Sequence, residues 1–468
     1  MQLPKLQSVD LNAKKKKKIL LLSDDLRMSS GVGTMSREFV MGSVHHFDWV
    51  QVGGAIKHPE QGKVVDMKQA VKDELGINGY LKIYPISGYG NEQILREIMK
   101  IEKPDAILHF TDPRFWIWLY QMEHEIRQNI PIMYYNIWDD LPTPRYNENY
   151  YRSSDLLLGI SKQTYGINKR LLNDYEDWQV KYIPHGVSEK RFSKLAKDSK
   201  EIIEMKDKLG VTDKKFNILY INRNIRRKQP GDFILAYKYF MDKLTPEERK
   251  DCSVIFHATP VDDNGTDVPA IVNELCPDYP VIFTHHLQEF SPLSGAGMNV
   301  LNNIADVYMN LASNEGFGLG SLEALTCGTP IIVNVTGGLQ DQCGFKKDGK
   351  YLTADDYVEL ESNHRGKYKE HGEWVKPVFP SSISLQGSPP TPYIFDDRCN
   401  PEDAAEKLYE LYKMGDEERR RIGEIGRQWV LSDVARMTGK HMSESFIEAI
   451  DTTFEKWKPR KRYTMEAI

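Results

Sequence analysis

The sequence predicts an α/β protein built from two doubly wound parallel sheets, and three observations lead to this prediction. Short apolar runs alternate with longer amphipathic stretches along almost the whole chain, as in strand–helix–strand units. Many of the runs are continuously apolar, as expected of strands that helices cover on both faces. The length of 468 residues exceeds that of a usual single domain, so we expect two such sheets facing a common cleft.

The predicted elements fall into two series. Apolar runs that each lead into a polar loop are predicted strands of the first series: 17–25, 105–112, 130–140, 155–161 and 180–187. Amphipathic stretches between them are predicted helices: 34–44, 91–100 and 162–172. The second series has five predicted strands: 216–223, 252–259, 280–286, 307–313 and 330–336. A Lys-rich stretch between the two series, residues 189–209, is predicted to be a helix.

The break between the two series sets the predicted domain boundaries. We expect a first Rossmann-like domain over residues 1–184 and a second over residues 185–439, with the last helix, residues 440–468, crossing back to the first. Residues 343–398 are rich in Gly, Pro, Ser and charged side chains and show no clear periodicity, so they are predicted to be an irregular insertion. A plain surface insertion and a lid or acceptor-binding loop both fit this segment.

Composition and charge restrict the class of protein. A net charge of -5 gives no overall attraction to nucleic acid or to anionic membranes, so such binding would have to be local. The five cysteines include no C-x-x-C pair, which favours a reduced intracellular protein without a thiolate metal site. The longest apolar run, residues 115–120, is too short to span a bilayer. We therefore expect a cytoplasmic protein with no integral membrane segment.

Residues 313–325, with the sequence SNEGFGLGSLEAL, place two glutamates, Glu315 and Glu323, around a glycine-rich loop. The loop joins a predicted strand to a predicted helix, so its backbone can approach an anion closely and donate amide hydrogen bonds to it. With Gly320 as the helix cap, Glu323 would complete a capping box, but Glu315 would stay unexplained. Two carboxylates that accept hydrogen bonds from hydroxyls, beside amides that suit a phosphate, describe a site for a sugar nucleotide.

A short basic segment supplies cations for the phosphate side of such a site. Within six residues, the end of the first strand of the second series and the loop after it carry Arg223, Arg226, Arg227 and Lys228. A guanidinium binds phosphate oxygens through a fork of N–H groups, and a lysine adds a mobile point charge. If a bond between sugar and diphosphate breaks, these charges stabilise the negative charge that grows on the leaving group. A basic loop exposed to solvent would have the same composition.

Taken in order, these motifs resemble those of the retaining glycosyltransferases of GT-B fold, glycosyltransferase family 4. The resemblance covers most of the chain. It lies in IPHGV at the domain boundary, in Arg223 followed five residues later by Lys228, in NEGFGLGSLEALTCGTPIIVNVTGG, and in the helix NPEDAAEKLYELY. Two glutamates separated by seven residues are a weak signal alone, but the ordered set in these strand contexts is specific.

The resemblance implies a role for each matched residue. Glu315 would contact the hydroxyls of the donor sugar, and Glu323 would hold the ribose hydroxyls. Arg223 and Lys228 would bind the diphosphate. Glu315, Arg223 and Lys228 would therefore also act in the transfer step.

The resemblance extends to two glycine-rich loops. The donor loop would complete the nucleotide-sugar site with Gly316, Phe317, Gly318 and Leu319, the last two through their amides. In SSGVGTMSREF near the N-terminus, Gly31 and Gly33 would approach the donor phosphate or the acceptor. A tight turn after a strand would need the same two glycines.

The first domain departs from the family at one position. The family carries a histidine near the reacting sugar, but the corresponding stretch here reads MYYNIWDDLP and contains none. His109, at the end of a neighbouring predicted strand, is the nearest candidate, although a strand-end histidine that is only hydrogen-bonded would look the same. Asp139 or Asp140 could supply the polar group near the anomeric carbon instead.

The predicted activity is therefore transfer of a sugar from a nucleoside diphosphate, UDP- or GDP-linked, to an acceptor hydroxyl with retention. No Asp-x-Asp metal clamp occurs, so we expect no metal cofactor. A saccharide or other soluble acceptor is favoured. DNA with a hydroxylated base is the alternative, because local basic clusters, 14–18, 223–228 and 456–463, and the aromatic residues at 115–118 could bind it. A non-catalytic protein that binds sugar nucleotides is the alternative of another class.

Overall fold

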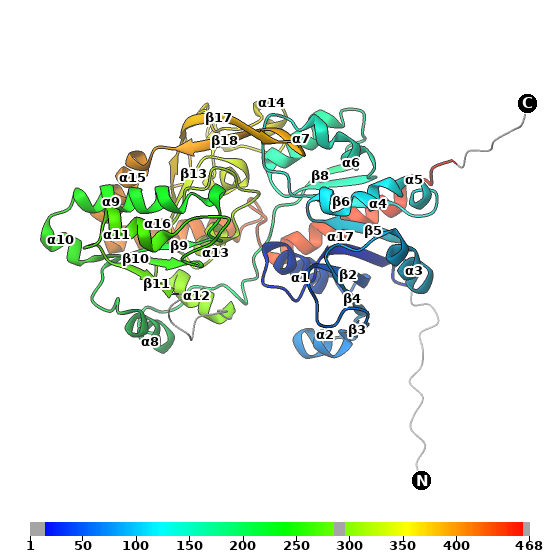
Figure 1. The fold of residues 1–468 in the computed structure, drawn as a ribbon, viewed down its shortest axis with the longest axis horizontal. Coiled ribbons are helices and arrows are strands. Elements are labelled where there is room, and N and C mark those ends of the chain that lie inside the picture. The colour runs from blue at the N-terminus through cyan, green and yellow to red at the C-terminus, as the bar shows by residue number, and fades with distance from the viewer. Residues whose placement is uncertain (1–14, 285–294, 462–468) are drawn as a thin grey trace, which may run out of the picture.

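The structure, a computed structural model, describes residues 15–284 and 295–461. It contains two mainly parallel sheets that form the centres of two domains lying side by side (Figure 1). The predicted two-sheet α/β architecture is therefore confirmed. The ends of the chain, residues 1–14 and 462–468, and the end of the predicted strand 280–286 lie outside the described residues.

The first sheet has eight strands in the order β3-β4-β2-β1-β5-β6-β7-β8. Their bounds are β1 (Lys18–Asp24), β2 (Asp48–Ile56), β3 (Val65–Asp66), β4 (Leu81–Ser87), β5 (Ala106–Phe110), β6 (Ile132–Asn136), β7 (Leu156–Gly159) and β8 (Val180–Tyr182). Every residue of β5, β6 and β7 is buried, which explains their mainly apolar sequences. β2 and β4 add to the strands that the sequence predicts.

The second sheet has six strands in the order β11-β10-β9-β12-β13-β16. Their bounds are β9 (Phe216–Ile221), β10 (Cys252–His257), β11 (Val281–Phe283), β12 (Val307–Asn310), β13 (Ile331–Asn334) and β16 (Val375–Val378). All neighbouring strands in this sheet run parallel. Their carboxyl ends therefore meet at one edge, where open sheets bind ligands.

Helices connect the strands of both sheets. In the first domain they are α1 (Gly31–Ser43), α2 (Lys68–Leu75), α3 (Glu92–Glu102), α4 (Ile117–Gln121), α5 (Glu123–Ile126), α6 (Glu148–Arg152) and α7 (Lys162–Leu171). In the second they are α8 (Lys200–Leu209), α9 (Pro230–Asp242), α10 (Pro246–Lys250), α11 (Val268–Leu275), α12 (Gly295–Ile304), α13 (Leu319–Thr326), α14 (Asp356–Leu360), α15 (Pro401–Met414) and α16 (Asp416–Val430). Short 3₁₀ turns add η1 (Pro113–Trp116), η2 (Arg145–Asn147), η3 (Arg226–Lys228) and η6 (Gly337–Cys343).

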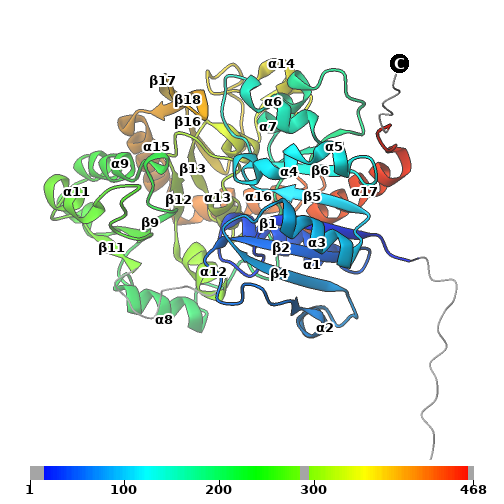
Figure 2. The ribbon, with the colours of Figure 1, turned by 45° about the vertical axis from the view of Figure 1, so that its right-hand side comes forward.

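The last helix, α17 (Gly439–Lys456), follows α16 of the second domain along the chain but lies beside the first sheet (Figure 2). It packs against α1, where the rings of Phe39 and Phe446 stack with centroids 4.5 Å apart. The chain crosses between the two domains near Val187 and again near Thr438, and a parallel β-bridge joins these two residues. None of the helices in the described ranges combines the length and apolar character needed to cross a membrane.

The segment 343–398 is not irregular, which corrects the prediction made from its composition. It contains the short pair β14 (Lys346–Lys347) and β15 (Lys350–Tyr351), helix α14 and the sheet strand β16. It then forms a long antiparallel hairpin of β17 (Pro380–Ser388) and β18 (Thr391–Cys399). Much of the hairpin is exposed to solvent, so its strands have a polar composition. For this reason the composition did not reveal that the segment is regular.

The Lys-rich stretch between the domains is also shorter as a helix than predicted. Only α8 forms, and it begins at Lys200 after Ser199. Residues 189–199 run as irregular chain, in which the amides of Ser193 and Leu195 donate hydrogen bonds to asparagine side-chain oxygens of α12. Tertiary contacts therefore replace helix formation in the first half of this stretch.

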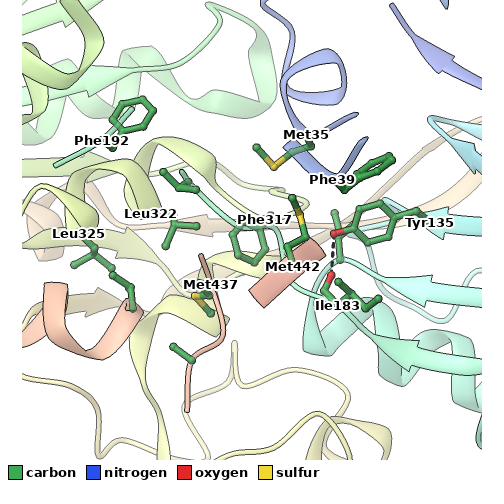
Figure 3. Packing of buried hydrophobic residues seen from close by; sticks show 14 of the residues in the cluster. Met35, Phe39, Tyr135, Ile183, Phe192, Phe317, Leu322, Leu325, Met437 and Met442 are labelled. Carbon is green, nitrogen blue, oxygen red and sulfur yellow. Dashed lines mark hydrogen bonds between the residues drawn. The ribbon is translucent and has the colours of Figure 1, made fainter. Parts of the chain in front are cut away.

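One buried cluster joins the two domains near the chain crossings. Figure 3 shows Met35, Phe39 and Tyr135 of the first domain facing Phe317 of the second, with Met442 of α17 between them. The hydroxyl of Tyr135 donates a hydrogen bond of 2.8 Å to the carbonyl oxygen of Ile183. This continuous apolar contact sets the position of the loop at Phe317 relative to the first domain.

Candidate active site

A cavity of about 1900 Å³ lies between the carboxyl ends of the strands of the two sheets. Loops that follow β5 and β6 line it from the first domain, and loops that follow β9, β10 and β12 line it from the second. The hairpin β17–β18 contributes a further wall. The cavity thus lies where open parallel sheets bind ligands, beyond the carboxyl ends of their strands.

The glycine loop after β12 forms the floor of the cavity on the second-domain side. Helix α13 begins at Leu319, and Gly318 before it has φ 89, a left-handed conformation that favours glycine. The amide of Gly338 donates a 2.8 Å hydrogen bond to the carbonyl oxygen of Glu315, so the turn after β13 supports the loop. The loop residues 316–320 all line the cavity, with the start of α13 directed at it.

Glu315 and Lys228 form a buried ion pair at this floor. Only 8% of Glu315 and 7% of Lys228 is exposed. Burial alone would raise the pKa of Glu315, but the charges of Lys228 and Arg227 more than offset it, so this pKa lies below its usual value. Burial lowers the pKa of Lys228, although the neighbouring carboxylate opposes the shift. The pair therefore presents an ionised carboxylate to the cavity.

The other cations of the basic segment lie at different depths in the cavity. Arg223 lines the cavity with a side chain that is 69% exposed, and its nearest carboxylate oxygen, on Asp262, is 4.0 Å away. Arg227 reaches further in, where its guanidinium donates a 2.6 Å hydrogen bond to the carbonyl oxygen of Asn314. Arg226 also lines the cavity. These guanidinium groups keep most of their N–H donors available to an anion.

Glu323 lies on the first turns of α13 and faces the same cavity. It does not cap the helix, because α13 begins at Leu319 and Glu323 is the fifth residue of the helix. The capping-box interpretation with Gly320 as the cap is therefore wrong. Burial raises the pKa of Glu323 to about 7, with Arg191 opposing the shift. Glu323 is half-buried and has no hydrogen-bonded cation among the described residues, so a ligand hydroxyl can satisfy its carboxyl group.

The raised pKa of Glu323 predicts how stability depends on pH. Because its folded pKa of about 7 exceeds the ordinary 4.5, the stability it confers is complete below pH 4.5 and is lost as the pH rises through 7. Glu323→Gln should therefore raise the thermal unfolding midpoint more at pH 8 than at pH 5.5. The exposed Glu417→Gln on α16 is the matched control, and an equal shift at both pH values would contradict the prediction.

The first-domain glycines lie on the opposite side of the cavity. Gly31 lines it, and a Cβ at this position would lie 3.6 Å from a methyl group of Leu319, so the two loops face each other. A Cβ at Gly33 would lie 2.8 Å from the carbonyl oxygens of Asp25 and Met28. Gly33 is therefore required by packing against its own loop, whereas Gly31 is placed to approach a ligand.

His109 does not reach the cavity, which corrects its prediction as a catalytic residue. It is fully buried in β5, where Nδ1 lies 2.7 Å from the Tyr120 hydroxyl and Nε2 lies 3.2 Å from Oγ1 of Thr111. Burial lowers the pKa of His109 to about 3. Both faces of β5 are covered, and the His109 side chain points into the core, whereas Phe110 and Asp112 line the cavity.

Asp139, the other first-domain candidate, does reach the cavity, unlike His109. It lines the cavity at the end of β6, close enough to Arg227, Glu315 and Lys228 for their charges to act on it. Burial raises the pKa of Asp139, with Arg227 opposing the shift. The neighbouring Asp140 bonds to Asn314 across the domains, and burial and Asp139 raise its pKa. Two carboxyl groups of the first domain thus face the ion pair of the second.

Sequence reasoning missed several residues of the cavity wall. His185, in the segment that joins the domains, lines the cavity with its ring 5.2 Å from that of Phe317. Trp138 also lines it, and the Arg114 guanidinium stacks on its ring at 4.9 Å. His185 lies within IPHGV, the segment matched at the domain boundary, but that motif assigned it no role, and no motif marks Trp138 or Arg114. Their place after β5, β6 and β8, at the carboxyl edge of a parallel sheet, was the available signal.

The basic clusters that suggested DNA binding do not form one surface. Lys17 and Lys18 pair with Asp105 and Glu102 at 3.1 and 2.9 Å. Arg460 pairs with a glutamate of α5 at 3.1 Å. Residues 14 and 462–463 of these clusters lie outside the described residues.

The aromatic residues of that alternative are also engaged. Trp116 is fully buried, and the ring of Phe115 stacks on Tyr89 with centroids 4.7 Å apart. The alternative of a DNA acceptor is therefore not supported.

Sequence comparisons connect the second domain with glycosyltransferases. Residues 284–359 match the family described as glycosyl transferases group 1. The chain is 27% identical over 204 residues to an alpha-monoglucosyldiacylglycerol synthase of Acholeplasma laidlawii, covering 44% of this chain and 46% of the relative. It is 27% identical over 167 residues to a D-inositol 3-phosphate glycosyltransferase of Salinispora arenicola, covering 36% of each. The chain thus spans less than half of the length of these two curated relatives.

Solved structures share the fold over nearly the whole chain. HepE of Anabaena in complex with UDP and glucose matches with a TM-score of 0.63 at 13% identity, covering 94% of this chain and 100% of HepE. Sucrose-phosphate synthase of Thermosynechococcus elongatus matches with a TM-score of 0.64 at 14% identity, again covering 94% and 100%.

The chain has the fold of a class, the GT-B glycosyltransferases, which these solved structures share. Within that class, the module at residues 284–359 is that of group 1. The GT-B fold is thereby confirmed, whereas membership of family 4 and retention stay predictions.

Proposed function

We propose that this protein transfers a sugar from a nucleoside-diphosphate donor, UDP- or GDP-linked, to an acceptor hydroxyl with retention of configuration. The observation that carries the proposal is the buried Glu315–Lys228 pair, which lies beside the start of α13 and beneath three arginines of one cavity. This arrangement supplies an ionised hydroxyl acceptor and phosphate-binding cations within one site. HepE, which shares the fold, forms complexes with UDP and glucose and with UDP-glucose, and this supports a nucleotide-sugar donor.

The charges of the site indicate where each part of the donor would bind. The sugar would lie over Glu315, whose carboxylate accepts hydrogen bonds from its hydroxyls. The diphosphate would lie between the start of α13 and Arg223, Arg227 and Lys228. Glu323, further along α13, would accept the ribose hydroxyls once it is ionised.

In the transfer step, the bond from the anomeric carbon to the diphosphate oxygen breaks and its electron pair stays on the diphosphate. The cations stabilise this negative charge as it develops. The acceptor oxygen forms the new bond on the same face, and its proton passes to the oxygen of the leaving phosphate. Asp139, which faces this position from the first domain, would interact with the positive charge that grows on the sugar.

Three measurements test the proposal. A donor that binds the folded protein at about a hundred times its dissociation constant should stabilise it by about 2.7 kcal/mol, so a thermal-shift screen of UDP- and GDP-sugars identifies it. Slow hydrolysis of that donor without an acceptor would separate an enzyme from a non-catalytic binding protein. NMR of the product then reads the anomeric configuration, and inversion would contradict retention.

The cations of the site also predict how a chelator acts. Because Arg223, Arg227 and Lys228 can neutralise the diphosphate, donor hydrolysis should continue at a similar rate in excess EDTA. In the described ranges, no three His, Cys, Asp or Glu side chains gather into a group that could hold a metal ion. Complete loss of hydrolysis, restored only by added Mg²⁺ or Mn²⁺, would refute this prediction.

A further inference from the structure

The hairpin β17–β18 spans the two domains and forms one wall of the cavity. Figure 1 shows it running from the second domain toward α7 of the first. On the second-domain side, Thr336 and His364 bond to the carboxylate of Asp397 at 2.8 and 2.9 Å. On the first-domain side, the Tyr393 hydroxyl accepts from the amide of Arg145 at 3.2 Å. The hairpin is therefore held at both ends in a defined position.

The two faces of the hairpin have different partners because side chains alternate along a strand. Tyr393, Phe395 and Asp397 share the face that packs against other elements. The ring of Tyr393, for example, packs on Tyr146, and the carboxylate of Asp397 is hydrogen-bonded within the second domain. The cavity is lined by Gln386, Ser388, Ile394 and Asp396, and also by Thr391, which a register shift in the hairpin pairs with Ser388. Cross-strand pairing sets Gln386 directly opposite Ile394. The hairpin thus presents an amide, hydroxyls and a carboxylate to the cavity around one aliphatic side chain.

Packed aromatic rings connect this hairpin to the part of the cavity wall that the first domain contributes. Tyr393 packs on Tyr146 with centroids 4.8 Å apart, and Tyr146 packs on Trp138 at 5.7 Å. Trp138 in turn carries the guanidinium of Arg114 on its ring. These contacts place the cavity side of the hairpin next to the loops after β5 and β6, away from the loop of Gly31.

The charges on this side of the cavity differ from those of the basic segment. Arg114 is neutralised by Asp112, which accepts from its Nε at 2.9 Å and from a terminal nitrogen at 2.5 Å. Asp396 and Asp139 add carboxyl groups. An acceptor that carries a phosphate or carboxylate would meet like charge here, which costs affinity. Groups that donate and accept single hydrogen bonds suit an uncharged ligand with many hydroxyls.

We infer that the β17–β18 hairpin is the acceptor-binding wall of this enzyme and that the acceptor is an uncharged saccharide or polyol. Gln386, Ser388 and Thr391 recognise its hydroxyls, and Ile394 contacts its carbon framework. The donor lies beside this wall, over Glu315 and the basic segment, because Asn314 next to Glu315 donates a 2.6 Å hydrogen bond to the carbonyl oxygen of Phe395 in the hairpin. The inference rests on the proposed glycosyl transfer, and it names the class of acceptor for that reaction.

The test compares acceptors and hairpin variants with one radiolabelled donor, the UDP- or GDP-sugar that the thermal-shift screen identifies. Glucose and maltose are the uncharged probes, and glucose 6-phosphate is the charged one. We expect kcat/KM for the uncharged probes to exceed that for glucose 6-phosphate by at least about tenfold. In Gln386→Ala, the acceptor KM should rise between about twofold and tenfold, as the loss of one neutral hydrogen bond predicts.

Leu385→Ala is the matched control, because Leu385 neighbours Gln386, is 62% exposed and does not line the cavity. In Gln386→Ala the ratio of transfer to donor hydrolysis should fall, and in Leu385→Ala it should stay the same. An unchanged ratio in Gln386→Ala, preference for glucose 6-phosphate, or donor hydrolysis without transfer to any uncharged probe would each overturn the inference and leave the proposed function standing. A screen in which no nucleotide sugar binds would instead remove the proposed function itself.

Discussion

Glu315→Gln should lower kcat by roughly 30- to 1000-fold, or about 2–4 kcal/mol in the transfer step, at saturating donor. The amide keeps the shape of the side chain but removes the charge that strengthens hydrogen bonds from sugar hydroxyls and that balances Lys228 in the buried pair. Arg223→Ala should produce a loss of similar size, because it removes a cation from the leaving diphosphate. Initial rates of donor consumption, with donor and acceptor varied separately, measure both effects.

The exposed arginine Arg420 on α16 offers a control for the change of charge, since it does not line the cavity. Arg420→Ala should turn over at the wild-type rate. If Glu315→Gln and Arg223→Ala did so as well, the assignment of the donor site would be wrong. A rise in donor KM at constant kcat would show that the two residues bind the ground state and the transition state equally well.

Lys228→Met should have the largest effect on stability of any single change in the site. It leaves the Glu315 carboxylate buried without its ion-pair partner, a situation that typically costs 3–5 kcal/mol, so about this loss is expected. The loss should be visible as a lower midpoint in urea unfolding followed by tryptophan fluorescence. The variant should also lose transfer activity, because the diphosphate loses a cation.

The double variant Lys228→Met/Glu315→Gln separates the ion pair from packing. Removing both charges removes the unpaired carboxylate, so the double variant should recover much of the stability that Lys228→Met loses. It should stay inactive, since both groups of the donor site are absent. A double variant as unstable as the single one would show that the methylene packing of Lys228, rather than its charge, holds this part of the fold.

The sequence by itself determined the class of fold and the loops that form the site. Strand–helix alternation is a local pattern, and continuous apolar runs such as β6 and β13 follow directly from burial on both faces. The polar residues that end these strands must meet at the carboxyl edge of a parallel sheet, so the glycine loop at Glu315 and the basic segment at Lys228 could be predicted to share one cleft.

Where local pattern was ambiguous, the prediction failed. The polar stretch 343–398 hid a hairpin, because an exposed antiparallel pair needs no apolar face along its whole length. His109 and Asp139 looked equally well placed in the sequence, because each comes at the end of an apolar run. When a strand is covered on both faces, its sequence does not tell which side chains reach the carboxyl edge of the sheet.

Only the tertiary structure decided which polar groups act on one another. Lys228 and Glu315 are 87 residues apart in the sequence, yet they form one buried pair whose mutual attraction holds the carboxylate ionised. Asp139 comes within range of that pair only because α17 and the apolar cluster at Phe317 hold the two domains together. Charges act through space over a few ångströms, so their partners depend on how the two sheets pack and not on the order of residues along the chain.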